Sequence, residues 1–158
     1  MRILVVSDSH GNYPSILQAE ELAGEIDAII HLGDGANDAI LIAQTLDIEV
    51  KMVAGNCDLG ASAPRELLWE CEGLRLLLTH GDRYGVKYSL ERLKQRGLEV
   101  EANVVLFGHT HTAAIIKTPE MLFVNPGTLI KSNHHKTFAI LAISSSGATA
   151  TLYDITPP

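Results

Sequence analysis

The chain has 158 residues, of which 46% are hydrophobic and 20% are charged. This length fits a single hydrophobic core, so we expect residues 1–158 to form one domain. No apolar run approaches the ~20 residues that a membrane-spanning helix needs. The net charge of -7 argues against a nucleic-acid partner, because Lys and Arg supply most of the affinity for a phosphate backbone.

The start of the chain bears on its location. A strand pattern begins at residue 2 and polar residues arrive at Asp8, which leaves no room for the apolar stretch of a signal peptide. We therefore expect a cytoplasmic protein. In that compartment Cys57 and Cys71 are not expected to form a structural disulfide.

The first third of the chain alternates between strand and helix patterns. Runs rich in Ile and Val predict strands at 2–7, 27–32 and 49–53. Helices are predicted at 13–23, ended by Gly24, and at about 36–46, where Ile40, Ile42, Ala43 and Leu46 can face the sheet. Strands joined by helices in this way make a sheet with right-handed crossovers.

The second part of the chain is rich in strands. Residues 66–71 and 74–79, joined at Glu72-Gly73, predict a hairpin. A helix is predicted at about 87–96, and strands at 103–107, 113–117, 121–124, 137–143 and 148–153. Residues 156–158 are expected to be a frayed end. Without further information, the pattern predicts an α/β protein with a β-rich C-terminal part.

Polar side chains follow five of these predicted strands at the point where each strand ends. In open α/β sheets, ligands bind outside the carboxyl ends of the strands. Each residue has an ordinary alternative. Asp and Asn are common in turns, His80 could cap a strand end, and His109 and His111 could be two ordinary surface histidines. Seven oxygen or nitrogen donors at equivalent positions predict one shared site, formed by Asp8, His10, Asp34, Asn56, His80, His109 and His111.

The donor set indicates which ions such a site would hold. Two Asp, one Asn and four His suit Mn²⁺, Fe²⁺, Zn²⁺, Co²⁺ or Ni²⁺, and argue against an iron–sulfur cluster or a Cys₄ zinc site. Seven donors are too many for one catalytic ion with an open position. They fit two ions about 3.5–4 Å apart that share a carboxylate, as in two-metal hydrolases.

These segments resemble the five sequence blocks of the calcineurin-like metallophosphoesterases. The blocks are Asp8-Ser9-His10, Gly33-Asp34, Gly55-Asn56-Cys57-Asp58, His80-Gly81-Asp82 and Gly108-His109-Thr110-His111. Their order and spacing are most similar to the small bacterial and archaeal phosphodiesterase branch. Asn125-Pro126-Gly127-Thr128 extends the resemblance over nearly the whole chain.

The resemblance implies a fold and a role for each donor. The fold is a two-sheet β-sandwich flanked by helices, in four layers α/β/β/α. One metal ion would be held by Asp8, His10 and His111, and the other by Asn56, His80 and His109, with Asp34 between the two. Asp34, Asn56, His80 and His109 are also expected to take part in catalysis.

The resemblance further implies hydrolysis of a small phosphate ester. Two divalent ions, with Mn²⁺ as the first expectation and Ni²⁺, Zn²⁺, Fe²⁺ or Co²⁺ as alternatives, would lower the pKa of a bridging water and hold the phosphoryl oxygens. Asp58 and Asp82 are candidates to orient histidine rings, with a solvated loop carboxylate as an equal alternative for each. No membrane partner is expected, and relatives of this size can form homodimers.

Two features leave alternatives open. Many larger relatives carry His where this chain has Cys57, and a thiol is a poor acid at neutral pH. We therefore expect faster hydrolysis of esters with acidic leaving groups, although Cys57 is also interpreted as a small buried residue beside the site. The alternatives to a phosphodiesterase are a phosphomonoesterase or phosphoprotein phosphatase, and a non-catalytic scaffold similar to the retromer subunit with this fold.

Overall fold

The computed structural model describes residues 1–155, which form two five-stranded sheets packed face to face. The first sheet has the order β10-β9-β1-β2-β3. Its strands are β1 (Arg2–Val6), β2 (Ala28–His31), β3 (Glu49–Met52), β9 (Thr137–Ser144) and β10 (Gly147–Asp154). β1, β2 and β3 are parallel, whereas β9 is antiparallel to both β1 and β10.

The second sheet has the order β4-β5-β6-β8-β7. Its strands are β4 (Glu66–Cys71), β5 (Leu74–Thr79), β6 (Val104–Leu106), β7 (Ala114–Lys117) and β8 (Leu122–Asn125). β5, β6 and β8 run parallel at its centre, and the outer strands β4 and β7 are antiparallel to their neighbours. Both sheets are therefore mixed. The parallel strands lie at the centre of the second sheet, whereas in the first sheet they extend to the edge strand β3.

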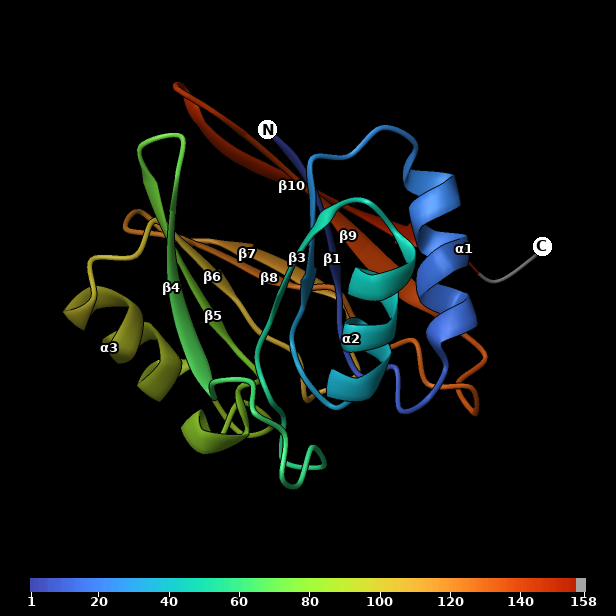
Figure 1. Ribbon diagram of the computed structural model, residues 1–158. Coiled ribbons are helices and arrows are strands. Elements are labelled where there is room, and N and C mark those ends of the chain that lie inside the picture. The colour runs from blue at the N-terminus through green and yellow to red at the C-terminus, as the bar shows by residue number, and fades with distance from the viewer. Residues whose placement is uncertain (156–158) are drawn as a thin grey trace.

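Helices cover the outer face of each sheet. α1 (Tyr13–Ala23) and α2 (Ala36–Thr45) pack on the first sheet, and α3 (Glu91–Glu99) packs on the second (Figure 1). A short 3₁₀ helix, η1 (Asp82–Tyr84), precedes α3. The expected sandwich of two sheets flanked by helices is confirmed. Among residues 1–155, no helix is long and apolar enough to cross a membrane.

The buried strands explain why their sequences are apolar throughout. In β1, Ile3 and Val5 pack between the two sheets, whereas Leu4 and Val6 face α1 and α2. Successive side chains of a strand point to opposite faces, so a strand with both faces covered needs no polar alternation. The same rule applies to Leu77, which faces α3.

Two expectations about the helices are wrong. Ile40 and Ala43 were expected to face the sheet, but both are exposed, and α2 buries Ala36, Ala39 and Ile42 instead. These three positions, spaced by three residues, form the helical stripe that meets the sheet. The helix expected from residue 87 begins at Glu91, and the chain before it forms η1 and then turns at residues 85–88. Residues 156–158 lie outside the described part of the chain.

Candidate metal centre

The seven predicted donors sit in loops that follow β1, β2, β3, β5 and β6. Three of these strands belong to one sheet and two to the other, and the loops meet across the sandwich. His111 Nε2 lies 3.1 Å from Asp8 Oδ1, which joins the loop after β6 to the loop after β1. His80 Nε2 lies 3.3 Å from Asp34 Oδ2, which joins the loop after β5 to the loop after β2.

Asp8 is fully buried and its two carboxylate oxygens face different partners. Oδ2 accepts hydrogen bonds from the Ser7 hydroxyl at 2.5 Å and from the backbone N–H of His109 at 3.1 Å. Oδ1 lies 3.1 Å from His111 Nε2 and 3.8 Å from His10 Nε2. One oxygen therefore fixes the carboxylate, and the other faces the imidazoles.

The two carboxylate oxygens of Asp34 also face different partners. Its Oδ1 accepts a hydrogen bond from the backbone N–H of Cys57 at 2.8 Å. Its Oδ2 lies 3.3 Å from His80 Nε2 and 3.7 Å from His10 Nε2. His10 is predicted to bind one metal ion and His80 the other; we call each ion with its ligands a half-site. Asp34 Oδ2 faces both histidines and therefore lies where a carboxylate shared by two ions would lie.

His80 and His109 complete the second cluster. His80 is fully buried, and its Nδ1 donates a hydrogen bond to the carbonyl oxygen of Leu32 at 2.8 Å. A ring nitrogen that donates to a carbonyl leaves the other nitrogen with a free lone pair. That nitrogen, Nε2, lies 3.2 Å from His109 Nδ1.

The donors thus form two groups with a shared edge. Asp8, His10 and His111 offer ligand atoms that lie within 4.8 Å of one another, and so do Asp34, His80 and His109. A third group of this kind contains His10, Asp34 and Cys57. Asn56, the remaining predicted ligand, is exposed beside Cys57, and its Nδ2 lies 3.5 Å from the Cys57 sulfur.

The electrostatics of the cluster favour a bound cation. Burial raises the pKa of Asp8, but the hydrogen bond with His111 and the charge of His80 outweigh burial and lower it overall. Burial is likewise outweighed at Asp34, whose pKa falls well below its usual range because His80 and the Cys57 N–H bind the carboxylate. Both carboxylates are therefore ionised at neutral pH.

The two imidazoles of the second cluster titrate in opposite directions. Burial lowers the pKa of His80, but Asp34 and Asp8 outweigh it and the pKa is raised. Burial and the charge of His80 lower the pKa of His109. The raised pKa of His80 follows from its two carboxylate neighbours, and the lowered pKa of His109 from burial and from its imidazole neighbour. A divalent cation bound here would balance the negative charge of the two carboxylates.

The spacing of three donor pairs fits metal ligation, whereas His10 Nε2 lies farther from the carboxylates, at 3.8 Å from Asp8 and 3.7 Å from Asp34. Two ligands bound at about 2.0–2.2 Å to one ion, at tetrahedral or octahedral angles, lie about 3.0–3.5 Å apart. The observed separations of 3.1 Å between Asp8 and His111, 3.3 Å between Asp34 and His80, and 3.2 Å between His80 and His109 fall in this range. The mixed nitrogen and oxygen set suits the divalent ions of the first transition series.

The backbone of these loops is unusual. Five of the seven predicted ligands have positive φ angles, and they are Asp8 (52°), His10 (47°), Asp34 (54°), His109 (68°) and His111 (59°). This left-handed conformation is unfavourable for residues with a Cβ atom and persists where the surroundings enforce it. Such strained residues cluster at functional sites, and no sequence pattern predicts a positive φ angle at a His residue.

Two predicted orienting residues do something else. Asp58 was expected to orient a histidine ring, but its carboxylate accepts the backbone N–H groups of Asp34, Gly35, Ala36 and Gly55 at 2.7–3.0 Å. It ties the loop after β2 to the loop after β3. Asp82 was also expected to orient a histidine, but it forms an ion pair with Arg65 at 2.5 Å. Both expectations are wrong.

Cys57 also differs from its expected environment. The side chain is exposed rather than buried, and both cysteines are free thiols, as expected. Burial of the sulfur and the nearby Asp34 carboxylate raise the pKa of Cys57. A thiol with a raised pKa stays protonated at neutral pH and gives up its proton reluctantly.

Two residues that hold the ligand-bearing loops in place were not predicted from the sequence. Asn125 donates hydrogen bonds to the Gly108 carbonyl at 3.1 Å and to the Thr110 hydroxyl at 2.9 Å, and so holds the loop of His109 and His111. Thr128 donates to the carbonyl of Asp8 at 2.9 Å. The Asn125-Pro126-Gly127-Thr128 block was the available signal, although the sequence did not say which loops it supports.

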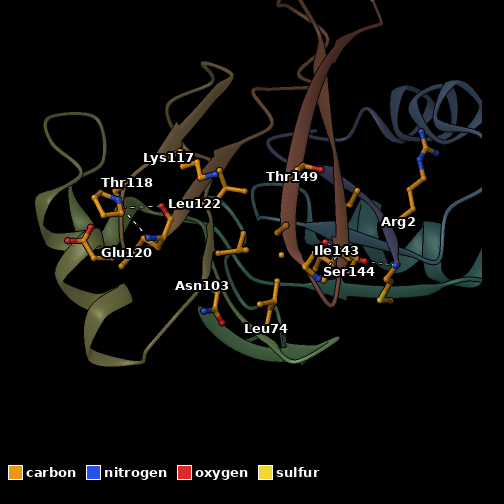
Figure 2. A pocket seen from close by; sticks show the side chains of 18 of the residues that line it. Arg2, Leu74, Asn103, Lys117, Thr118, Glu120, Leu122, Ile143, Ser144 and Thr149 are labelled. Carbon is orange, nitrogen blue, oxygen red and sulfur yellow. Dashed lines mark hydrogen bonds between the residues drawn. The ribbon is translucent and has the colours of Figure 1, made fainter.

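A cavity of about 650 Å³ lies elsewhere, between the two hairpins β7–β8 and β9–β10 (Figure 2). Arg2, Leu74, Asn103 and Leu122 line it, which places it at the amino ends of β1, β5, β6 and β8. The predicted ligands follow the carboxyl ends of strands, and none of them lines this cavity. The chemistry of the donor cluster therefore belongs to the opposite end of the sandwich.

Comparison with known proteins supports a phosphoesterase family. The sequence profile of the calcineurin-like phosphoesterase superfamily domain matches residues 1–146. The probable metallophosphoesterase YsnB of Bacillus subtilis is 32% identical over 157 residues, which cover 98% of this chain and 91% of that protein. The phosphodiesterase MJ0936 of Methanocaldococcus jannaschii is 28% identical, with 80% of this chain and 83% of that protein covered.

Solved structures show the same fold. A predicted phosphoesterase from Streptococcus pneumoniae superposes with a TM-score of 0.82 at 26% identity, covering 98% of this chain and 89% of that one. Vps29 from Chaetomium thermophilum superposes with a TM-score of 0.79 at 20% identity, covering 97% and 88%, a likeness of fold alone. On the profile match and the Bacillus relative, this chain belongs to the calcineurin-like phosphoesterase superfamily.

Proposed function

We propose that this protein is a phosphodiesterase that depends on two divalent metal ions. One observation carries the proposal: two clusters of ligand atoms converge from five loops, and Asp34 Oδ2 lies between His10 of one cluster and His80 of the other. Members of the family act on phosphate esters, and similar proteins from archaea and bacteria are named phosphodiesterases.

The residues present define how the site would work. Asp8, His10 and His111 would hold one ion, Asn56, His80 and His109 the other, and Asp34 both. When bound, two such ions supply a hydroxide nucleophile at neutral pH and neutralise charge on the phosphoryl oxygens. Three hydrogen bonds would keep the other ligand atom of Asp8, Asp34 and His80 directed toward the ions. They run from Ser7 to Asp8, from the Cys57 N–H to Asp34 and from His80 to Leu32.

Asn56 and Cys57 would face the substrate, because both side chains are exposed at the edge of the cluster. The amide hydrogens of Asn56 can donate to a phosphate oxygen while its carbonyl binds metal. Cys57 occupies a position from which an acid could protonate the leaving oxygen, but its raised pKa makes it a weak one. The proposal therefore includes a preference for leaving groups that need no protonation.

Manganese is the proposed physiological ion, with Ni²⁺, Zn²⁺, Fe²⁺ and Co²⁺ as alternatives of the same chemistry. A small phosphodiester is the proposed substrate. Two other functions compete with this proposal. A phosphomonoesterase would use the same ligands with a different pocket, and a Vps29-like scaffold would need no metal chemistry, although all seven donor positions here hold competent ligands.

The test is hydrolysis by metal-stripped protein, without and with added Mn²⁺. Three substrates are compared: bis-p-nitrophenyl phosphate, the monoester p-nitrophenyl phosphate and a dialkyl phosphate. Asp34→Asn removes the shared carboxylate charge, and Asp47→Asn, an exposed carboxylate in the loop before β3, is the matched control. We expect Mn²⁺-dependent cleavage that is fastest for the aryl diester, is lost in Asp34→Asn and is retained in Asp47→Asn.

Each other outcome points to a different function. Faster cleavage of the monoester would replace the phosphodiesterase with a phosphatase. Equal rates for aryl and alkyl diesters would refute the role assigned to Cys57. No turnover by folded protein with any divalent ion would reject an enzyme and leave a scaffold as the better account.

A further inference from the structure

Directly behind the metal centre lies a buried polar network that the proposed mechanism does not use. It consists of Ser9, His31 and Asp38, whose exposed fractions are 0%, 1% and 6%. The Ser9 hydroxyl lies 2.8 Å from His31 Nε2 and donates to Asp38 Oδ2 at 2.5 Å. The backbone N–H of Gly11 donates to the same carboxylate oxygen at 2.8 Å.

The hydrogen bonds of this network have one consistent direction. The backbone N–H of Gly33 donates to His31 Nδ1 at 3.1 Å, so that nitrogen is the acceptor. The proton of the neutral ring is then on Nε2 and is donated to Ser9, whose own proton goes to Asp38. The Ser9 hydroxyl, both ring nitrogens of His31 and Asp38 Oδ2 each have a partner, so loss of one member leaves buried groups unsatisfied.

The network connects the two loops that carry the carboxylate ligands. Ser9 lies between Asp8 and His10, and His31 binds the backbone just before Asp34. The same loops are also paired by backbone hydrogen bonds from Asp8 to Gly33 at 3.0 Å and from His10 to Asp34 at 2.9 Å. Side chains and backbone therefore fasten the loop after β1 to the loop after β2.

Gly35 shows how closely the network is packed. A Cβ atom at this position would lie 2.1 Å from the Ser9 hydroxyl and 2.8 Å from the His31 ring. Only a residue without a side chain allows the loop after β2 to lie against the hydrogen bond between Ser9 and His31. The loop Gly33-Asp34-Gly35 therefore packs against the network at Gly35 and carries the proposed ligand Asp34.

We propose that Ser9, His31 and Asp38 are positioning residues that set the metal affinity of the half-site formed by Asp8, His10 and His111. The proposal rests on the proposed metal centre and deepens it. Asp8 and His10 on either side of Ser9 hold positive φ angles of 52° and 47°, which need external support. The network supplies that support from α2, where Asp38 lies in the first turn.

Loss of the network should weaken metal binding at only one of the two half-sites. His80 is oriented by the carbonyl of Leu32, and the loop of His109 is held by Asn125, neither of which belongs to the network. Removing the Ser9 hydroxyl should therefore disturb Asp8 and His10 and leave the other cluster in place. Loss of a group that supports metal ligands typically weakens metal affinity by about 10–100-fold.

The experiment is a titration of metal-stripped, full-length protein with Mn²⁺, with free Mn²⁺ followed by electron paramagnetic resonance. Ser9→Ala is compared with wild type and with His111→Ala and His109→Ala, which mark the two half-sites. Ser15→Ala is the matched control, because Ser15 is a buried serine on α1 whose hydroxyl accepts a hydrogen bond only from Asn12 among the contacts recorded for residues 1–155. Thermal unfolding of each metal-free variant reports stability separately.

We expect Ser9→Ala to weaken one of two sites by about 10–100-fold and to resemble His111→Ala rather than His109→Ala. Ser15→Ala should bind as wild type does, and Ser9→Thr, which restores a hydroxyl, should recover most of the affinity. The proposal is overturned if Ser9→Ala keeps both affinities, loses both equally, or is not rescued by Ser9→Thr. Wild-type protein that binds two ions but hydrolyses no ester would refute the proposed function and leave this inference standing.

Discussion

Asp8, Asp34 and His80 each present one polar atom to the protein and the other to the metal centre. Ser7, Cys57 and Leu32 provide the hydrogen bonds that fix this orientation. A ligand held in this way loses little side-chain freedom when it binds an ion, and its alignment does not depend on the ion. At the scale of single residues, contacts within the protein therefore fix the orientation of these proposed ligands.

Gly55 offers the sharpest test of this organisation. A Cβ atom there would lie 2.1 Å from Asp34 Oδ1 and 2.6 Å from the Asp34 backbone nitrogen. We expect Gly55→Ala to displace the shared carboxylate and to reduce Mn²⁺-dependent diester hydrolysis by at least ~10²-fold, since small misplacements of reacting groups have effects of that size. Steady-state kinetics and Mn²⁺ titration would measure both consequences.

Gly60 provides the control for that substitution. It lies in the same loop with a positive φ of 76°, and no atom lies within 4 Å of the position that a Cβ would take. Gly60→Ala should therefore strain the loop backbone without pushing on Asp34. If both variants lost activity to the same extent, general destabilisation of the loop would explain the loss, and the steric argument for Gly55 would fail.

The convergence of most of the proposed donors could be predicted from the sequence, but the contacts that support them could not. Each donor follows an apolar run, and strand ends are visible in a sequence. The network of Ser9, His31 and Asp38 joins residues that are up to 29 positions apart in the chain, and such contacts exist only once the sheets are assembled. His31 is buried in β2 and hydrogen-bonded through both ring nitrogens, but nothing in the sequence indicates which residues are its partners.

At the scale of elements, the connection between β5 and α3 departs most from prediction. The sequence favoured a helix from residue 87, whereas η1 ends at Tyr84, Gly85 follows it with a left-handed φ of 61°, and α3 starts at Glu91. Side-chain contacts with β4 and α3 stabilise this arrangement. The Tyr84 hydroxyl donates a hydrogen bond to Glu66, and Arg96 of α3 binds the same carboxylate at 2.6 Å.

This contact predicts a stability effect at high pH. Burial and the hydrogen bond to Glu66 raise the pKa of Tyr84 to about 12, compared with about 10 in an unfolded chain. The stabilisation is therefore fully present below pH ~10 and is lost as the pH rises towards 12. Tyr84→Phe should destabilise the protein by about 1 kcal/mol at neutral pH, and the difference from wild type should shrink above pH ~10.

Urea unfolding at several pH values between neutral and strongly alkaline would measure this difference. Tyr88→Phe is the matched control, because Tyr88 lies in the same connection and is 95% exposed. Its unfolding free energy should follow wild type at every pH. A gap between wild type and Tyr84→Phe that stayed constant through pH 11 would contradict the assigned hydrogen bond.

At the scale of the whole molecule, the sandwich brings together ligands that span residues 8 to 111. The alternation of strands and helices predicted the first sheet, and the hairpin at 66–79 marked the second. The order of the strands within each sheet was harder to predict from the sequence. The β-rich C-terminal part divides, with β7 and β8 joining one sheet and β9 and β10 the other, and local patterns carry no information about that choice.

Because the ligands come from both sheets, metal binding should stabilise the whole fold. An unfolded chain cannot gather donors from five loops, so ions bind almost only the native state. At a Mn²⁺ concentration about 100 times the dissociation constant, one site contributes about 2.7 kcal/mol. For a chain of this length that corresponds to a rise in Tm of about 5–10 °C.

Thermal unfolding of metal-stripped protein with and without Mn²⁺ would show this rise. Ca²⁺ should produce a smaller one, because it prefers oxygen ligands and the centre contains four imidazoles. Asp34→Asn should reduce the shift more than any substitution confined to one half-site, since Asp34 Oδ2 lies 3.7 Å from His10 Nε2 of one cluster and 3.3 Å from His80 Nε2 of the other. An equal shift in Asp34→Asn and wild type would mean that the stabilising ions bind elsewhere, and the two-sheet metal centre would have to be abandoned.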